Sequence, residues 1–237
     1  PLLQLAEERT DLIRMRGPRL TPAADNCGEE FFTTETWTEG PRRFTRTTLR
    51  IAGRTMTSLA RRDAEVDTVW TVEHLLKDAD DVEAYLQLPQ EVFRHDVDVS
   101  DLIAADEQIG QDGIVMVDVG DPICHAAPLL SMADYTVLAM TEPALFHRLL
   151  EKLSREIHRR TEQVAREFPA HLWRICGSEY ASEPYLPPRL YEEYVVRYTA
   201  PMVQAIERHG GFARIHSHGR LRAILPHIAG MGASGLD

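Results

Sequence analysis

Short apolar runs that alternate with long helical segments constrain the fold of this chain more than any other feature. Residues 114–119 form a nearly continuous apolar run, typical of a parallel strand buried on both faces, and the turn signal Gly120-Asp121-Pro122 follows it. Similar runs lie at residues 172–177 and 212–216, and residues 235–237 begin a fourth. Strands separated by helical segments indicate βαβ units and a parallel sheet.

The segments between these runs have helical patterns. Residues 128–168 are predicted to be helical with a break at Thr141-Glu142-Pro143, because proline fits the first turn of a helix. Residues 189–209 form a second predicted helix, which Gly210-Gly211 ends, and residues 221–228 form a third. Right-handed crossovers place the carboxyl ends of all the strands on one side of the sheet, so we expect the loops after them to converge.

The first part of the chain has a different pattern. Residues 2–15 are amphipathic and predict a helix, as do residues 72–86. Residues 44–51 and 55–59 flank a turn at Gly53-Arg54, which predicts an antiparallel hairpin. We expect these elements to elaborate the more regular second part of the chain.

Composition excludes several classes of protein. The chain of 237 residues is 43% hydrophobic and has a net charge of -11, which argues against a nucleic-acid binder with a basic face. No apolar run approaches the roughly 20 residues that span a bilayer. Cys27, Cys124 and Cys176 lack the spacing of a disulfide framework, so we expect a cytoplasmic protein. Cys176 is interpreted as a buried small hydrophobe, and Cys124 as a weak candidate for a reactive thiol.

Two histidines lie two residues apart where the third apolar run ends. Residues i and i+2 of a strand point to the same side, so the rings of His216 and His218 can both face one point. Two ligands of one metal ion require this arrangement. Histidine pairs at strand ends also act as ordinary polar residues that bind loops, and the pattern alone leaves both interpretations open.

Three loops are expected to converge at the same side of the sheet, over residues 120–127, 177–187 and 216–220. They carry side chains suited to catalysis, binding or metal ligation: Asp121, Cys124, His125, Glu179, Tyr180, Glu183, His216 and His218.

Several motifs of the second half, in this order and spacing, resemble the uroporphyrinogen decarboxylase (URO-D) superfamily. The matching features are Gly120-Asp121-Pro122, Thr141-Glu142-Pro143, Gly177-Ser178-Glu179, residues 187–194, Gly210-Gly211, His216-Ser217-His218-Gly219 and Gly235-Leu236-Asp237. The resemblance implies an α/β fold, a (β/α)8 TIM barrel with its site at the carboxyl face. We expect one domain over residues 1–237, with an N-terminal helical and β-hairpin elaboration over residues 1–112 and regular βα units over residues 113–237. Such a barrel needs roughly 250 residues, so we expect this one to be incomplete at its C-terminus.

The superfamily has two well-known branches. One decarboxylates the acetate side chains of uroporphyrinogen without a cofactor. The other transfers methyl groups between a corrinoid and a thiol such as coenzyme M, and zinc activates the thiol. The zinc branch typically carries His-x-Cys-Gly where this chain has His216-Ser217-His218-Gly219, so the chain looks nearer to that branch, with His218 in place of cysteine. The decarboxylase motif Arg-Gln-Ala-Gly-Arg is absent from the sequence.

The resemblance implies a zinc ion (Zn²⁺) bound by His216 and His218, with a third ligand from Glu179 or from a residue beyond Asp237. Glu179 is also expected to be catalytic. The other expected site residues are His125 and Tyr180 as catalytic groups, and Asp121 and Arg220 as substrate-binding groups.

The expected partners are a small-molecule substrate, a corrinoid protein as methyl donor and a second copy of the chain in a homodimer, without nucleic acid or membrane. Two alternatives stay open. One is cofactor-free decarboxylation in tetrapyrrole (porphyrin) biosynthesis, with Arg220 better placed than Arg174 or Arg214 to bind carboxylates. The other is a barrel that binds a corrinoid or a tetrapyrrole without catalysis.

Overall fold

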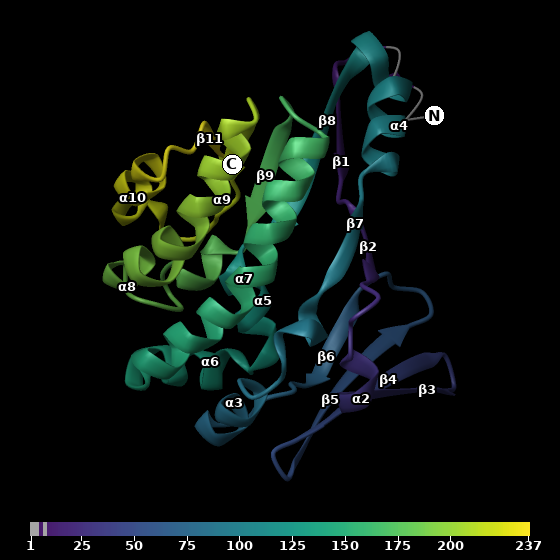
Figure 1. Cartoon of the computed structure of the whole chain (residues 1–237), viewed down its shortest axis with the longest axis vertical. Coiled ribbons are helices and arrows are strands. Elements are labelled where there is room, and N and C mark those ends of the chain that lie inside the picture. Colours follow the sequence, from purple (N-terminus) through teal and green to yellow (C-terminus); the bar gives the residue numbers. More distant parts are fainter. Residues whose placement is uncertain (1–4, 7–8) are drawn as a thin grey trace. The chain divides into compact units, whose positions relative to one another are not determined.

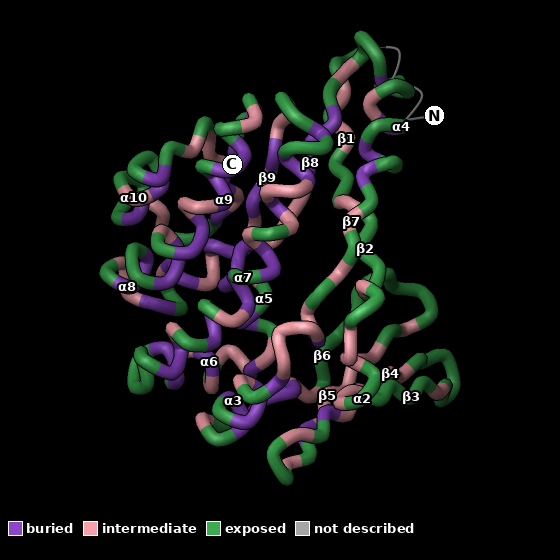
Figure 2. The backbone as a smooth tube through the Cα atoms, in the orientation of Figure 1, coloured by how far each residue is buried: buried purple, intermediate pink, exposed green. Residues whose placement is uncertain are grey.

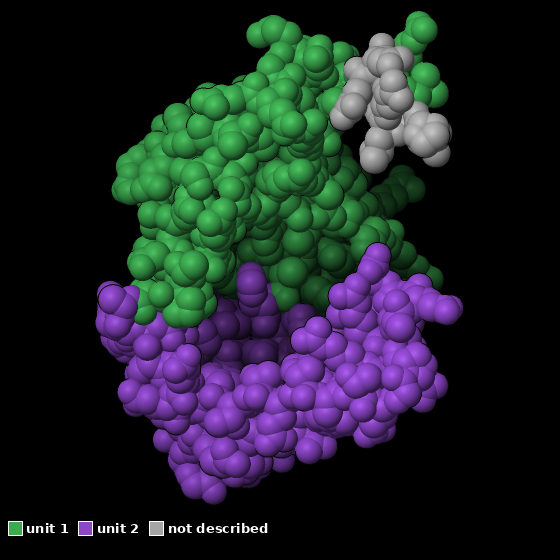
Figure 3. Space-filling model, turned by 90° about the vertical axis from the view of Figure 1, so that its right-hand side faces the viewer, with its two compact units in different colours: residues 1–23, 95–124, 154–237 green, residues 24–94, 125–153 purple. Residues whose placement is uncertain are grey.

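The computed structural model of the chain describes residues 5–6 and 9–237 and divides into two compact units (Figure 3). Unit 1 comprises the residues up to Ala23, His95–Cys124 and Ser154–Asp237. Unit 2 comprises Ala24–Arg94 and His125–Leu153.

A parallel sheet forms the centre of unit 1 (Figure 1). Its strands, in spatial order, are β1 (Leu12–Arg16), β8 (Gly113–Gly120), β9 (Leu172–Cys176), β10 (Phe212–Ile215) and β11 (Gly235–Leu236). The three apolar runs and the fourth strand are therefore confirmed. Over the described residues these strands make an open sheet, so the fold is mixed α/β with a parallel sheet, and the expected barrel is not closed.

The helix predicted over residues 2–15 is wrong in its second half. Residues 2–4 and 7–8 lie outside the described residues, and Leu12–Arg16 forms β1, which pairs in parallel with β8. The segment continues into β2 (Arg19–Pro22), which pairs antiparallel with β7 (His95–Asp98). Pairing with distant strands overrides the local helical pattern here, because each strand satisfies its backbone groups across the ladder.

The long helices follow the predicted pattern. Helix α7 (Pro143–Glu167) starts at Pro143 and follows α6 (Met132–Thr141), so the predicted break is confirmed. The leucines at helical spacing in α7, Leu145, Leu149 and Leu153, are all buried. The other helical segments are α4 (Ser100–Ile109), α5 (Pro122–Ala126), α8 (Arg189–Tyr191), a π-helical turn (Glu192–Val196), α9 (Arg197–Arg208) and α10 (Leu225–Gly230).

The two faces of the parallel sheet differ in chemistry. Val117, Trp173 and Ile215 lie on the covered face and are buried. Strands β8 and β9 include buried segments, purple in Figure 2, and helices α4 and α9 contact the sheet at β8 and β10. Full burial of each such side chain contributes about 1.5–3 kcal/mol. The opposite face is more open, and Ile114 and Phe212 on it are 46% and 57% exposed. Strand β8 is thus not buried on both faces along its whole length.

Unit 2 contains an antiparallel sheet in the order β3-β4-β5-β6. Its strands are β3 (Phe32–Glu39), β4 (Arg42–Ile51), β5 (Arg54–Asp63) and β6 (Val69–Glu73). The predicted hairpin is confirmed as β4 and β5, joined by a turn in which Ala52 and Gly53 have positive φ angles of 51° and 73°.

The helix predicted over residues 72–86 begins later than expected. Residues up to Glu73 belong to β6, and helix α3 covers Ala79–Tyr85. Asp78 determines the start of the helix, because its side chain accepts a hydrogen bond from the backbone N–H of Asp81.

Among the described residues, no single helix is long and apolar enough to cross a membrane. The segments Pro122–Leu129 and Met132–Thr141 meet the length and composition criteria only as a pair, with a bend of 115° between them.

Candidate metal-binding site

The carboxyl ends of β8, β9 and β10, with the loops that follow them, carry most of the predicted site residues. Unit 1 contains Asp121, Glu179, Tyr180, His216, His218 and Arg220. His125 is an exposed residue of α5 and belongs to unit 2.

Glu179, His216 and His218 form a group that could hold a metal ion. One ligand-type atom from each residue lies within 4.8 Å of the other two. The histidine rings lie 5.6 Å apart between centroids, and His218 Nε2 lies 3.9 Å from Glu179 Oε1. The structure thus brings both predicted metal ligands together with the carboxylate proposed as the third.

Short polar contacts fix the loops that carry this group. The backbone N–H of Gly177 donates to Glu179 Oε2 at 3.0 Å, which orients the carboxylate. Ser178 Oγ donates to the carbonyl of His216 at 3.3 Å, and Ser182 Oγ lies 3.0 Å from the carbonyl of His218. Two serines of the loop after β9 therefore hold the backbone of the histidine turn.

Gly219 closes the histidine turn in a conformation that favours glycine. Its φ angle is +105°, and a Cβ atom there would lie 2.8 Å from the carbonyl oxygen of Glu183. A side chain at this position would both strain the backbone and push the two loops apart.

Asp237 faces His216, a contact that sequence analysis missed. Its Oδ1 atom lies 3.3 Å from His216 Nδ1, which is buried and makes no hydrogen bond of good geometry. Arg214 holds the other carboxylate oxygen at 3.0 Å, and Arg174 Nε lies 4.0 Å from it. Arg174 also donates to Asp118 at 2.7 Å.

These charged residues form a row across the open face of the sheet. Asp118 is in register with Arg174, and Arg174 is in register with Arg214. His216 lies two residues after Arg214, so it points to the same side of the sheet. Sequence analysis set Arg174 and Arg214 aside as strand residues. The signal that would have found this row is a single Asp or Arg inside each of the three apolar runs.

Asp121 is buried beneath the loop after β9. It accepts hydrogen bonds from the N–H of Cys124 at 2.8 Å and from Thr199 Oγ1 at 3.2 Å. Burial raises the pKa of Asp121 to about 8, although these two hydrogen bonds act to lower it. Its expected contact with substrate stays a prediction.

Arg220, Tyr180 and His125 do not belong to the group of three ligand-type side chains. Arg220 is highly exposed and lies 3.8 Å from Glu183. Tyr180 is half-buried, and burial raises the pKa of its hydroxyl. The roles of Arg220, Tyr180 and His125 stay predictions.

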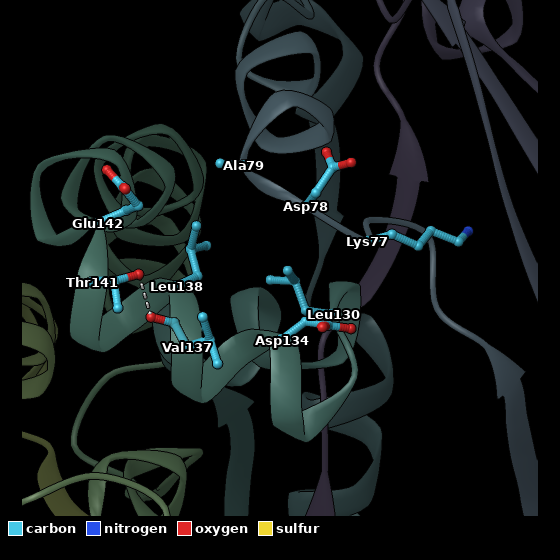
Figure 4. Close-up of a pocket in the computed structure, with 9 residues that line it drawn as sticks. All are labelled: Lys77, Asp78, Ala79, Leu130, Asp134, Val137, Leu138, Thr141 and Glu142. Carbon is cyan, nitrogen blue, oxygen red and sulfur yellow. Dashed lines mark hydrogen bonds between the residues drawn. The ribbon is translucent and has the colours of Figure 1, made fainter.

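Unit 2 has a separate pocket of about 270 Å³, drawn in Figure 4. Its lining residues are Lys77, Asp78, Ala79, Leu130, Asp134, Val137, Leu138, Thr141 and Glu142. None of the predicted site residues is among them, so this pocket is not the candidate metal-binding site.

Comparison with solved structures gives several matches. A methyltransferase from Methanosarcina mazei matches with a TM-score of 0.50 and 14% identity, over 71% of this chain and 49% of that one. The chain thus spans about half the length of that methyltransferase, and at this identity the likeness shows the fold alone. A Vibrio cholerae LapD S helix-GGDEF-EAL structure, bound to c-di-GMP, matches over 88% of this chain and 39% of that one with 14% identity, and its TM-score of 0.27 carries no argument.

A comparison with curated proteins found no match. The uroporphyrinogen decarboxylase (URO-D) family, in contrast, matches residues 65–237, which include strands β8 to β11 and the candidate site. Because this match covers well over half of the sequence, the chain belongs to the uroporphyrinogen decarboxylase (URO-D) family.

Proposed function

We propose that this chain is a zinc-dependent enzyme of its family that transfers a methyl group between a corrinoid and a thiol acceptor. The observation that carries the proposal is the group formed by Glu179, His216 and His218, whose ligand-type atoms lie within 4.8 Å of one another. Family membership supports an enzyme, and the fold likeness to a methyltransferase agrees with the proposal.

The donor set fits zinc. Two imidazoles and one carboxylate make up one of the three-ligand sets of catalytic zinc sites, which leave a fourth position for substrate. A zinc ion held there would lower the pKa of a thiol substrate, so that thiolate forms near neutral pH.

The residues of the chain orient this donor set. Asp237 faces Nδ1 of His216, which leaves Nε2 as the nitrogen available for ligation. Arg214 and Arg174 hold the Asp237 carboxylate, and the N–H of Gly177 holds Glu179. With His218 in place of a cysteine thiolate, the donor set carries one negative charge fewer, which favours a strong Lewis acid over a strongly nucleophilic thiolate.

A second candidate is cofactor-free decarboxylation of a tetrapyrrole. The observation in its favour is that Arg174 and Arg214 lie on the same face of the sheet as His216, where cations can bind substrate carboxylates. Asp118 and Asp237 each pair with one of these arginines, however, so both positive charges are already compensated. This pairing places decarboxylation second.

Metal content tests the proposal. The chain, purified without added metal, is expected to contain zinc in stoichiometric amount, and the His216→Ala/His218→Ala variant is expected to lose it. A His74→Ala/His227→Ala variant removes two histidines outside the group and should keep the metal. A well-folded chain without zinc, which also fails to bind added zinc, would overturn the proposal and move decarboxylation to first place.

A further inference from the structure

Two of the three cysteines meet at the base of the loop after β9. Cys124 lies in α5 and Cys176 ends β9. The two thiols interact with each other, and Cys176 Sγ donates a hydrogen bond to the carbonyl oxygen of Val119 at 3.4 Å. Both are free and half-buried, so the interpretation of Cys176 as a buried small hydrophobe is wrong. The third cysteine, Cys27, belongs to unit 2.

Backbone hydrogen bonds hold the segments that carry these two cysteines close to each other. The N–H of Asp121 donates to the carbonyl of Cys176 at 2.9 Å, and the N–H of Cys124 donates to the Asp121 carboxyl group at 2.8 Å. A Cβ atom on Gly177 would lie only 2.4 Å from the Cβ atom of Cys124. No other side chain therefore has room to separate α5 from the end of β9 at this point.

The interaction makes the two thiols chemically unequal. It lowers the pKa of Cys176 and raises the pKa of Cys124, which burial raises further. An accessible thiol of lowered pKa beside a second thiol is the arrangement in which one sulfur attacks and the other resolves the product.

We propose that Cys124 and Cys176 form a reversible disulfide by exchange with a low-molecular-weight disulfide such as oxidised glutathione. The Cys176 thiolate attacks one sulfur of the small disulfide, which forms a mixed disulfide and releases one small thiolate. The Cys124 sulfur then attacks Cys176 Sγ, its proton passes to the departing small thiolate, and the second small thiol leaves. Two protein thiols are oxidised and one small disulfide is reduced to two thiols.

The test is oxidation of the folded chain in glutathione buffers, followed by acid quenching, alkylation and mass spectrometry. The wild type is expected to lose two of its three alkylatable thiols and two hydrogens in mass, without a glutathione adduct. Peptide mapping should find Cys124 joined to Cys176, and dithiothreitol should restore both thiols. The Cys27→Ser variant should behave in the same way.

Single variants separate the two roles. Cys124→Ser should accumulate glutathione on Cys176, because the resolving thiol is absent, whereas Cys176→Ser should accumulate much less on Cys124. Near-ultraviolet circular dichroism checks that each variant keeps its tertiary structure. The proposal is overturned if the folded wild type keeps three free thiols, carries glutathione on separate cysteines, or forms bonds only between chains through Cys27.

Discussion

His216 Nδ1 lies 3.3 Å from Asp237 Oδ1, between the carboxyl ends of the neighbouring parallel strands β10 and β11. A carboxylate at the second nitrogen of an imidazole fixes the tautomer and the orientation of the ring. The contact therefore links the end of β11 to the candidate metal-binding site, although Asp237 itself is outside the group of ligand-type residues.

Replacing Asp237 with asparagine should weaken zinc binding by roughly 10- to 100-fold, because the carboxylate no longer orients His216. Competition with a chelating dye measures the affinity. Glu183→Gln is the matched control, since Glu183 faces the exposed Arg220 at 3.8 Å and makes no contact with His216 in this arrangement. Unchanged zinc affinity in a folded Asp237→Asn variant would show that Asp237 does not position the ring.

Asp121 should make the chain less stable as pH rises. Its pKa is raised to about 8 from an ordinary value of 3.8, so between these values the folded state holds a proton that the unfolded state has released. The free energy of unfolding should therefore fall by up to about 1.4 kcal/mol for each pH unit in this window. Asp121→Asn cannot ionise and should remove this part of the slope.

Urea unfolding of both proteins between about pH 5 and pH 8 measures the difference in slope directly. Groups other than Asp121 titrate equally in the two proteins, so they cancel in the comparison. Parallel pH profiles for the wild type and Asp121→Asn would contradict a raised pKa at this position.

Gly177→Ala should destabilise the chain by roughly 3 kcal/mol, from backbone strain and overpacking together. Gly177 has a φ angle of +122°, and a Cβ atom would lie 2.3 Å from Asp121 Oδ1. Gly230→Ala is the control, because nothing lies within 4 Å of a Cβ atom there, and it should change stability little. Equal unfolding midpoints in urea for the two variants would argue against close packing at Gly177.

Asp78→Ala should cost about 1 kcal/mol, since it removes the N-cap of α3. Asp80→Ala is a close control. Arg54 lies 3.5 Å from Asp78 and 3.7 Å from Asp80, so each variant loses a similar ion pair, but only Asp78 accepts the N–H of Asp81. The difference between their thermal unfolding midpoints isolates the cap, and no difference would mean that the cap contributes nothing.

Local sequence patterns were sufficient to predict strands and helix starts that depend on neighbouring residues alone. The apolar run at residues 114–119 forms most of β8, and Pro143 begins α7 as its fixed φ angle favours. The rings of His216 and His218 lie close together, as their spacing predicted, although both residues belong to the turn after β10 and not to the strand.

Features that depend on distant pairing could not be predicted from local patterns. Strand β1 exists because Leu12–Arg16 aligns with β8, a segment far along the chain. The contact between Asp237 and His216 depends on the register of β10 with β11, and the contact between Cys124 and Cys176 depends on the packing of α5 against the end of β9. A single sequence contains no direct signal for any of these three pairings.

The charged row of Asp118, Arg174 and Arg214 also bears on how the sheet assembles. A slip of β9 by one residue would turn Arg174 toward the covered face, where Trp173 is now 1% exposed, and would bury a guanidinium group without its carboxylate. A slip by two residues would keep the face but separate Arg174 from Asp118. The same charges that hold Asp237 beside His216 therefore select against misaligned sheets, so substitutions in this row are expected to lower the yield of correctly folded chain as well as to alter the site.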